Sequence, residues 1–239
     1  MIHFLICTVG GADLVEIALR SIDRYAGECQ VDIMKLDEAT LTPRSHGAAI
    51  DFWRERQKVG VKDTDAVCIM DPDVALLSEW WRREVDRALF EENPGNVGIW
   101  GAGAVEDYGP RVHASMMVIR GRLFNDLIRS FTPCLDPRER MWRDTGGLYC
   151  MWAKDAGWAV MPVERADDWH GFSAWYSRPE ENRHVVKGSL TSAHYPMWTH
   201  LGGGTHSDPT RLTLWQRIRR WKTIRRRKAF IKAVMEHLA

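Results

Sequence analysis

Eight consecutive residues, Ala66-Val67-Cys68-Ile69-Met70-Asp71-Pro72-Asp73, decide the fold. The first five are apolar and rich in β-formers, and a short apolar run of this kind is typical of a buried strand. Two aspartates follow at once, and the spacing of apolar residues then predicts a helix over about 78–92, with Ser78 as its N-cap. A buried strand that ends in two carboxylates and leads into a helix predicts one unit of an α/β fold.

The chain before this stretch repeats the same order of elements twice. Apolar runs predict strands over 2–9 and 31–36, and helical spacing predicts helices over 13–25 and about 45–57. Asp13 is a plausible N-cap for the first of these helices. Because strands and helices alternate, we expect an α/β fold with a mainly parallel central sheet flanked by helices.

The second half of the chain has a weaker pattern. Strands are expected over 97–102, 112–119 and 158–163, with a helix over 144–157. Residues 167–209 are rich in His, Trp, Gly and Ser and are predicted to be mostly irregular, which is typical of a functional loop. Several of the twelve tryptophans fall in this half, where their rings could line a sugar or base pocket or pack in a core.

Composition places the chain among ordinary globular proteins. Its 239 residues are 45% hydrophobic and 27% charged, which suffices for one full α/β domain, expected over 1–209. The five cysteines are scattered without CxxC spacing, so a reducing cytosol fits best. No stretch approaches the roughly 20 apolar residues that cross a bilayer. We therefore expect a cytoplasmic protein, at most peripheral to a membrane.

A basic C-terminal tail over 210–239 follows this domain. Residues 211–232 contain many arginines and lysines and no acidic residue. The tail predicts an amphipathic helix that binds anionic membrane or nucleic acid, or one that packs its apolar stripe on the domain. That stripe consists of Leu214, Ile218, Trp221, Phe230, Ile231 and Val234.

Polar residues gather where the predicted strands end. Thr8, Asp37 and Asp71 each close one strand, and in a parallel sheet these ends lie at the edge where ligands bind. Asp71 and Asp73 can both reach one hard cation, and Mg²⁺ or Mn²⁺ commonly takes one or two carboxylates with phosphate and water. The sequence therefore predicts a metal site that holds a diphosphate.

These local sequences resemble GT-A glycosyltransferases of the family-2-like group over about residues 2–165. The first strand and helix, Asp37 after the second strand, Asp71-Pro72-Asp73, and the run 143–160 ending in Ala-Gly before a strand are similar. The usual Glu-Asp pair of that group reads Arg143-Asp144 here. The resemblance implies the GT-A fold, a nucleotide-sugar donor such as a UDP- or GDP-sugar, and a nucleotide base held by Asp37.

The resemblance makes Asp144 the candidate general base that takes the proton of the acceptor hydroxyl. The alternative is that Asp144 only caps a helix. Inversion is favoured, because no second carboxylate nucleophile is evident. The resemblance also suggests His200, ahead of His206 or His194, as a further ligand of the metal or a partner of the diphosphate.

The remaining candidates have weaker support. Gly202 and Gly203 would let backbone N–H groups approach phosphate oxygens, and His46 and Thr8 could contact the nucleotide. Asp168 with Trp169 offers a rival base or a clamp for the acceptor.

Two other readings remain open. A nucleotidyltransferase of related fold would carry a basic residue in the loop after the first strand, where this chain has Asp13. A non-catalytic protein that binds nucleic acid or membrane through the tail would not explain carboxylates and histidines at strand ends. A P-loop enzyme is excluded, because no GxxxxGK[ST] run occurs. The acceptor is expected to be modified DNA or a membrane-proximal glycan or lipid.

Overall fold

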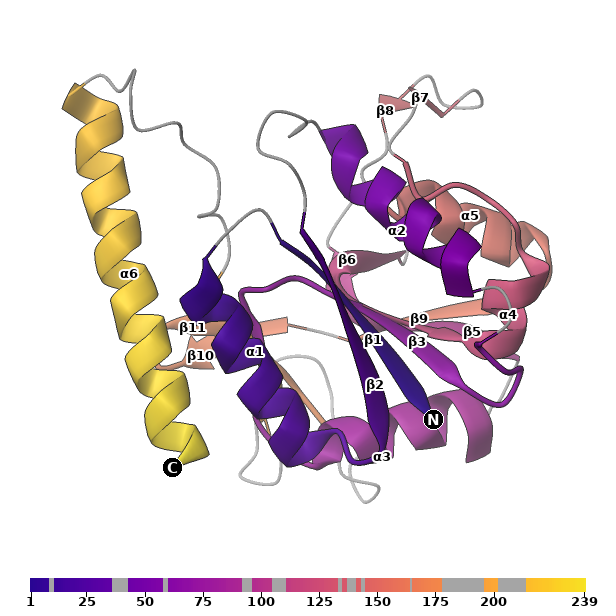
Figure 1. The fold of residues 1–239 in the computed structure, drawn as a ribbon, viewed down its shortest axis with the longest axis horizontal. Helices are drawn as coiled ribbons and strands as arrows, with labels where there is room; N and C mark the ends of the chain where they lie inside the picture. The colour runs from indigo at the N-terminus through magenta and orange to yellow at the C-terminus, as the bar shows by residue number, and fades with distance from the viewer. Residues whose placement is uncertain are drawn as a thin grey trace.

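A computed structural model describes residues 1–8, 11–35, 43–57, 60–91, 96–104, 111–132, 135–136, 141–142, 145–163, 165–177, 196–201 and 214–239. Its centre is a six-stranded sheet of order β2-β1-β3-β6-β5-β9 (Figure 1). Within this sheet β6 runs antiparallel to both neighbours, and the other five strands share one direction. The prediction of a mainly parallel sheet is confirmed. The strands are β1 (Ile2–Thr8), β2 (Cys29–Lys35), β3 (Ala66–Met70), β5 (Val97–Ala104), β6 (Arg111–Arg120) and β9 (Ala159–Val163).

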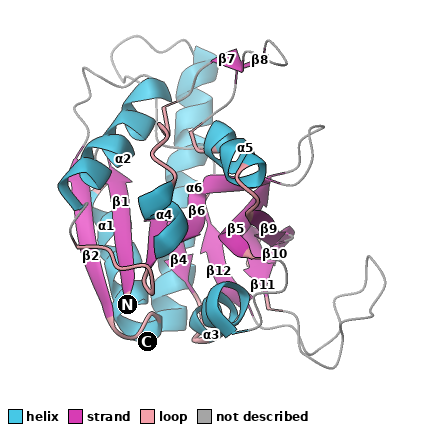
Figure 2. Ribbon diagram, turned by 90° about the vertical axis from the view of Figure 1, so that its right-hand side faces the viewer, coloured by secondary structure: helices cyan, strands magenta, loops and turns pink. Residues whose placement is uncertain are grey.

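Helices cover both faces of the central sheet, as Figure 2 shows. Along β1, Phe4 and Ile6 face one side while Leu5 and Cys7 face the other, because successive side chains of a strand alternate. Both sides are buried, which explains the unbroken apolar run in the sequence. One face carries α1 (Ala12–Tyr25), α3 (Trp80–Asp86) and the π-helical turn η2 (Arg87–Glu91); the other carries α2 (Pro43–Gln57), α4 (Gly121–Asp126) and α5 (Gly147–Asp155).

A second, antiparallel sheet of order β10-β11-β12-β4 packs beside the first. The strands are β4 (Val74–Leu76), β10 (Arg165–Trp169), β11 (Phe172–Tyr176) and β12 (Pro196–His200). The prediction that 167–209 is mostly irregular was therefore wrong for the described parts of this segment. The strands β4, β11 and β12 have three to five residues and pack on both faces, so they show no clear alternation of apolar and polar residues.

The basic tail forms one helix, α6 (Leu214–Leu238), beside α1 and the second sheet (Figure 1). Phe230 and Val234 are fully buried there, and the Phe230 ring meets Phe172 edge-on at 5.1 Å. Arg227 pairs with Asp13 of α1. The C-terminal half of α6 therefore packs its apolar stripe on the domain.

Separately, β7 (Leu135–Asp136) and β8 (Met141–Trp142) form a two-stranded ribbon.

Three expected helix starts differ from the structure. The N-cap of α1 is Gly11 at φ 79°, a left-handed conformation that suits glycine, and Asp13 lies inside the first turn. The helix α3 begins at Trp80, and the Ser78 hydroxyl donates to the Pro196 carbonyl instead of capping it. The helix α5 begins at Gly147 after an N-cap at Gly146, later than the predicted start at 144. In each case a distant contact or a glycine turn replaces the local side-chain cap.

Among the described residues, no helix combines the length and the apolar composition needed to cross a membrane.

Candidate metal centre

The two aspartates lie where the chain passes from the first sheet to the second. Met70 ends β3, and the next backbone N–H, that of Asp71, donates to the Ser115 carbonyl of β6 at 2.9 Å. The Val74 N–H donates back to the Asp71 carbonyl at 3.2 Å, which closes a tight turn before β4. This turn fixes both carboxylates at the carboxyl end of β3.

Strand pairing brings His200 to the same place. His200 ends β12 and lies opposite Val74 of β4 in the antiparallel ladder. The Leu201 N–H donates to the Asp73 carbonyl at 3.0 Å, which extends the ladder by one bond. The His200 Nε2 is consequently 3.1 Å from Asp73 Oδ1.

Asp71, Asp73 and His200 each offer one ligand atom, and these atoms all lie within 4.8 Å of one another. Asp73 is 5% exposed, so its carboxylate has little water to satisfy it. Carboxylate oxygens and an imidazole nitrogen are ligand atoms that divalent cations accept. The group can hold a divalent cation, and the prediction that these three residues come together is confirmed.

The charges around His200 are consistent with a cation site. Burial alone would lower the pKa of His200, but the hydrogen bond to Asp73 and the negative charges of Asp73 and Asp71 outweigh it. The pKa is therefore raised above 6.5, with Arg226 of α6 acting in the opposite direction. A proton on His200 stabilises the two carboxylates, and a divalent cation would take its place.

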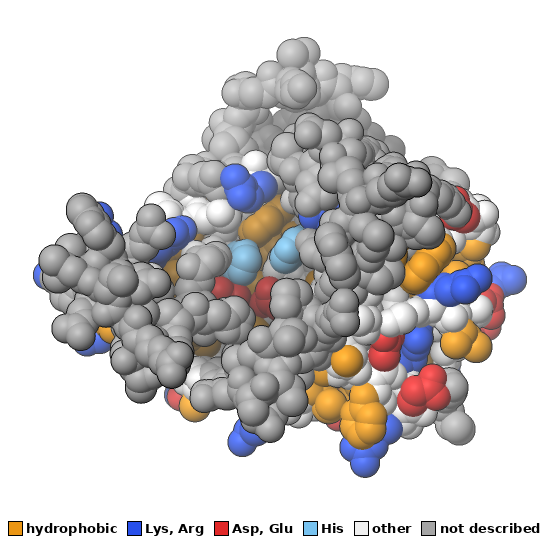
Figure 3. Space-filling view, turned by 90° about the horizontal axis from the view of Figure 1, so that it is seen from above, with side chains coloured by type: hydrophobic (Ala, Val, Ile, Leu, Met, Phe, Trp, Pro, Cys, Tyr) orange, Lys and Arg blue, Asp and Glu red, His pale blue; other side chains and the backbone are white. Residues whose placement is uncertain are grey.

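A cleft of about 120 Å³ adjoins Asp71. Seen from above, histidine and acidic side chains lie together in a hollow on this face of the molecule (Figure 3). The His46 Nε2 of α2 is 3.9 Å from Asp71 Oδ1 across the cleft. The lining residues include His46, Asp71, His113, Ala114, Ser115 and Thr145.

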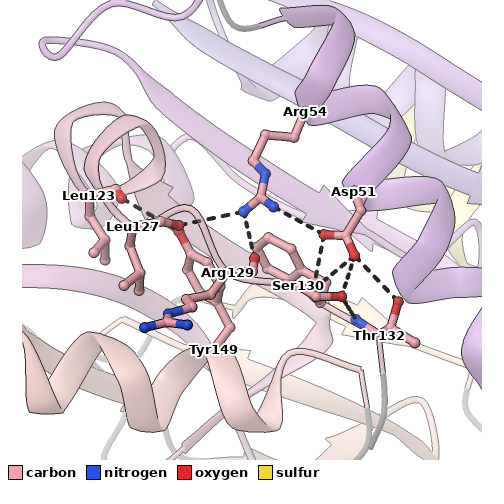
Figure 4. A network of polar contacts seen from close by, with 9 residues as sticks. Asp51, Arg54, Leu123, Leu127, Arg129, Ser130, Thr132 and Tyr149 are labelled. Carbon is pink, nitrogen blue, oxygen red and sulfur yellow. Dashed lines mark hydrogen bonds and ion pairs between the residues drawn. The ribbon is translucent and has the colours of Figure 1, made fainter.

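A polar network holds α2, and with it His46, against the segment after α4 (Figure 4). Asp51 accepts hydrogen bonds from the Ser130 and Thr132 hydroxyls and from the Phe131 N–H. Arg54, one turn further on, donates to the Arg129 carbonyl at 2.6 Å. This network fixes the lateral position of α2 relative to the cleft.

Gly47 lets α2 come this close to the same segment. A Cβ at Gly47 would lie 2.5 Å from the Phe131 carbonyl oxygen, too near for any side chain. His46 immediately precedes Gly47 in the chain, so the close approach of α2 to this segment also sets the position of the His46 imidazole.

The strand β1 ends with Cys7 and Thr8. Thr8 is buried, and its predicted contact with a nucleotide stays a prediction. Burial, together with the Asp71 charge, raises the pKa of the Cys7 thiol to about 12. Cys7 therefore stays a thiol and is a poor nucleophile for chemistry at this site.

The other predicted site residues are less informative. Asp37, Asp144, Gly202 and Gly203 lie outside the described residues. Asp168 belongs to β10, of which the structure describes the backbone at this position. Trp169 is buried beside α6, with its ring 5.9 Å from that of His237, in the cluster that fastens the helix. Trp169 therefore packs in this cluster and is not among the residues that line the cleft.

Sequence reasoning missed His113, Ser115 and Thr145 in the cleft. The strand predicted over 112–119 contains the first two, but nothing in its pattern distinguished them from other strand positions. Thr145 had a usable signal, because it follows the candidate base Asp144 directly.

No family model and no curated protein sequence matches the chain. Solved structures that resemble part of it include the following two. A197 from STIV is 14% identical over 54% of this chain and 69% of that one, with a TM-score of 0.34. A glycosyltransferase involved in the glycosylation of the major capsid of PBCV-1 is 10% identical over 50% of this chain, with a TM-score of 0.37. The chain spans 59% of that glycosyltransferase, and a likeness of this size does not extend to activity.

Proposed function

We propose that the protein is a divalent-metal-dependent glycosyltransferase that moves a sugar from a nucleoside diphosphate donor to a hydroxyl acceptor. The observation that carries the proposal is the group of Asp71, Asp73 and His200 beside a polar cleft. Two carboxylates at the carboxyl end of the parallel strand β3, joined by an imidazole from β12 of the second sheet, suit a metal-bound diphosphate. The GT-A resemblance of the sequence points the same way.

The residues divide into those that hold the donor and those that move the proton. A divalent cation such as Mn²⁺ or Mg²⁺ would, when bound, offset the negative charge of the diphosphate leaving group. Asp71, Asp73 and His200 would hold this ion. The acceptor hydroxyl loses its proton to the base, its oxygen bonds to the anomeric carbon, and the electron pair of the broken bond leaves with the diphosphate.

Asp144 is the proposed base. Its neighbour Thr145 lines the cleft next to Asp71, which supports a place for Asp144 near the reacting atoms. Asp144→Asn keeps the size of the side chain and removes its basicity, so it should leave donor affinity unchanged and lower transfer by at least about a hundredfold. Full transfer by Asp144→Asn would exclude this base.

The acceptor is proposed to be anionic or to lie on an anionic surface. Within residues 222–239, whose side chains the structure describes, five basic side chains of α6 are exposed, and the one acidic residue, Glu236, pairs with Lys232. Binding to phosphates would weaken steeply as salt rises. The two sources differ in their readout, because DNA would shift in a gel and anionic vesicles would sediment with the protein. The five are Lys222, Arg225, Arg226, Lys228 and Lys232.

The test of the activity is donor hydrolysis over a panel of UDP- and GDP-sugars with Mn²⁺ or Mg²⁺. We expect slow release of nucleoside diphosphate that EDTA abolishes and added Mn²⁺ restores. Failure to bind or hydrolyse any nucleotide sugar would refute the proposal. A nucleotidyltransferase would instead release pyrophosphate from a nucleoside triphosphate and a sugar phosphate, which a second assay with those two substrates detects.

A further inference from the structure

The basic helix α6 passes the edge of the central sheet at which the candidate metal centre lies. Figure 1 shows α6 alongside α1 and continuing past the first turn of that helix. Arg227 pairs with Asp13 of α1, and a Cβ at Gly11 would lie 3.1 Å from a nitrogen of the Arg227 guanidinium. Gly11 lies just after the carboxyl end of β1. This turn of α6 is therefore level with the carboxyl ends of the parallel strands.

Arg226 of α6 lies beside the strand ladder that ends in His200. Phe230, one turn further along α6, is fully buried, and residues four apart share one face of a helix. The guanidinium carbon of Arg226 lies 5.7 Å from the centre of the Phe172 ring. The next residue of β11, Ser173, is opposite His200 of β12. The positive charge of Arg226 is therefore held on the side of the domain that carries His200.

This charge acts at the centre and is not used by a carboxylate. Burial and the Arg226 charge both lower the pKa of His200, although the hydrogen bond to Asp73 and the negative charges around it raise that pKa overall. Arg226 forms no ion pair with any residue that the structure describes, whereas its neighbour Arg227 is paired with Asp13. A guanidinium in this position can bind an anion that enters the centre.

We propose that Arg226 binds phosphate oxygens of the donor's diphosphate when that diphosphate occupies the candidate metal centre. This inference rests on the proposed function, which supplies the diphosphate. Charge balance is the physical reason. The two carboxylates of Asp71 and Asp73 cancel the two positive charges of a divalent cation, so most of the diphosphate charge is left for other groups. The guanidinium offers both a positive charge and a planar fork of N–H donors that matches phosphate.

The Arg226 charge should have opposite effects on the cation and on the diphosphate. Before a diphosphate binds, Arg226 repels a divalent cation, so removing its charge should leave the affinity for Mn²⁺ equal or higher. With the cation in place the guanidinium attracts the diphosphate, so removing its charge should lower the affinity for the diphosphate. A structural defect around the centre would lower both affinities, which separates a binding role from a structural one.

Arg226→Met removes the charge and keeps a long apolar side chain against Phe172. Because Arg226 is exposed, the variant should unfold at the wild-type temperature. Isothermal titration calorimetry measures Mn²⁺ alone, and then UDP and GDP with Mn²⁺ present. We expect unchanged or tighter binding of Mn²⁺, and about tenfold weaker binding of the nucleoside diphosphate that wild type prefers. Arg226→Lys keeps the charge and should recover part of this loss.

Lys228→Met is the matched control. Lys228 carries the same charge on the same helix and is also exposed, but it lies about 200° around the helix axis from Arg226. The control should bind the nucleoside diphosphate as wild type does. Equal weakening by Lys228→Met would assign the effect to the general charge of α6 and overturn the inference, as would unchanged diphosphate affinity in Arg226→Met. Wild type that binds neither UDP nor GDP in the presence of Mn²⁺ would instead refute the proposed function.

Discussion

Asp73 is the most buried member of the candidate metal centre, and His200 is its partner at 3.1 Å. A carboxylate in this position has no water to replace a lost ligand, so its contribution to cation binding should be large. The neighbouring Asp71 is more open and borders the cleft. The two aspartates are therefore unequal: Asp73 would serve only an ion, whereas Asp71 would serve the ion and also lines the cleft.

Asp73→Asn should lower the affinity for Mn²⁺ by at least about a hundredfold, because it removes one of the ligand charges. Isothermal titration calorimetry with MnCl₂ measures this directly. Asp23→Asn, at an exposed position of α1, is the matched control and should bind Mn²⁺ as wild type does. Unchanged affinity in Asp73→Asn would rule out the proposed ligand set.

A second buried aspartate, Asp65, contributes to stability and not to the site. Burial alone would raise its pKa, but hydrogen bonds from the Lys62 N–H, His3 and the Met1 ammonium outweigh burial and lower it from 3.8 to about 2. A carboxyl whose pKa is lowered on folding stabilises the protein above pH 3.8, and this stabilisation is lost as the pH falls toward 2.

Asp65→Asn should therefore reduce the free energy of unfolding by about 1–3 kcal/mol at pH 7, the usual effect of losing hydrogen bonds to a charged group. Urea unfolding between pH 2 and 7 tests both parts, and the difference from wild type should shrink below pH 4. Asp63→Asn, on the exposed surface nearby, should change stability little. A difference that persists unchanged at pH 2 would contradict the role of the charge.

At the scale of elements, the C-terminal half of α6 holds this helix on the rest of the protein by packing in its core. Phe230 is 0% exposed and packs on Phe172, whereas Ile224 of the same helix is 43% exposed. Phe230→Ala should reduce the free energy of unfolding by about 3–5 kcal/mol through the cavity that it leaves. Ile224→Ala should change it by less than about 0.5 kcal/mol. Denaturant titration compares the two, and equal effects would contradict this packing of α6.

The sequence predicted those elements whose pattern is local. The apolar runs of β1 and β3 and the helices α1 and α2 were found because each shows its own periodicity. The strand β4 was missed, since three residues are too few for a pattern and its pairing partner β12 lies far along the chain. Helix starts at Gly11 and Gly146 were missed for a related reason, because a glycine turn leaves no capping side chain to recognise.

At the scale of the whole molecule, the candidate metal centre joins two sheets. Asp71 and Asp73 follow β3 of the central sheet, and His200 ends β12 of the second. The aspartates could be predicted from their place after a strand, and His200 from the resemblance. His113 and Ser115, which line the cleft, could not, because nothing in the pattern of β6 distinguishes them from other strand positions.

A cation that binds only the folded centre should stabilise the whole fold. At a Mn²⁺ concentration one hundred times the dissociation constant, linkage predicts about 2.7 kcal/mol. For a chain of this length, that corresponds to a rise in Tm of roughly 5–10 °C. Differential scanning calorimetry with and without MnCl₂ measures the rise, which should vanish in Asp73→Asn. An equal rise in that variant would place the stabilising ion elsewhere.

The turn at Asp71–Asp73 lies early in the chain, and His200 lies about half the chain later. During synthesis the carboxylates leave the ribosome well before the imidazole, so a nascent chain has an incomplete centre until β12 has docked. A chain that has misassembled its second sheet would therefore lack the complete Asp-Asp-His group even if its first sheet were intact, and binding of a divalent cation would distinguish the two.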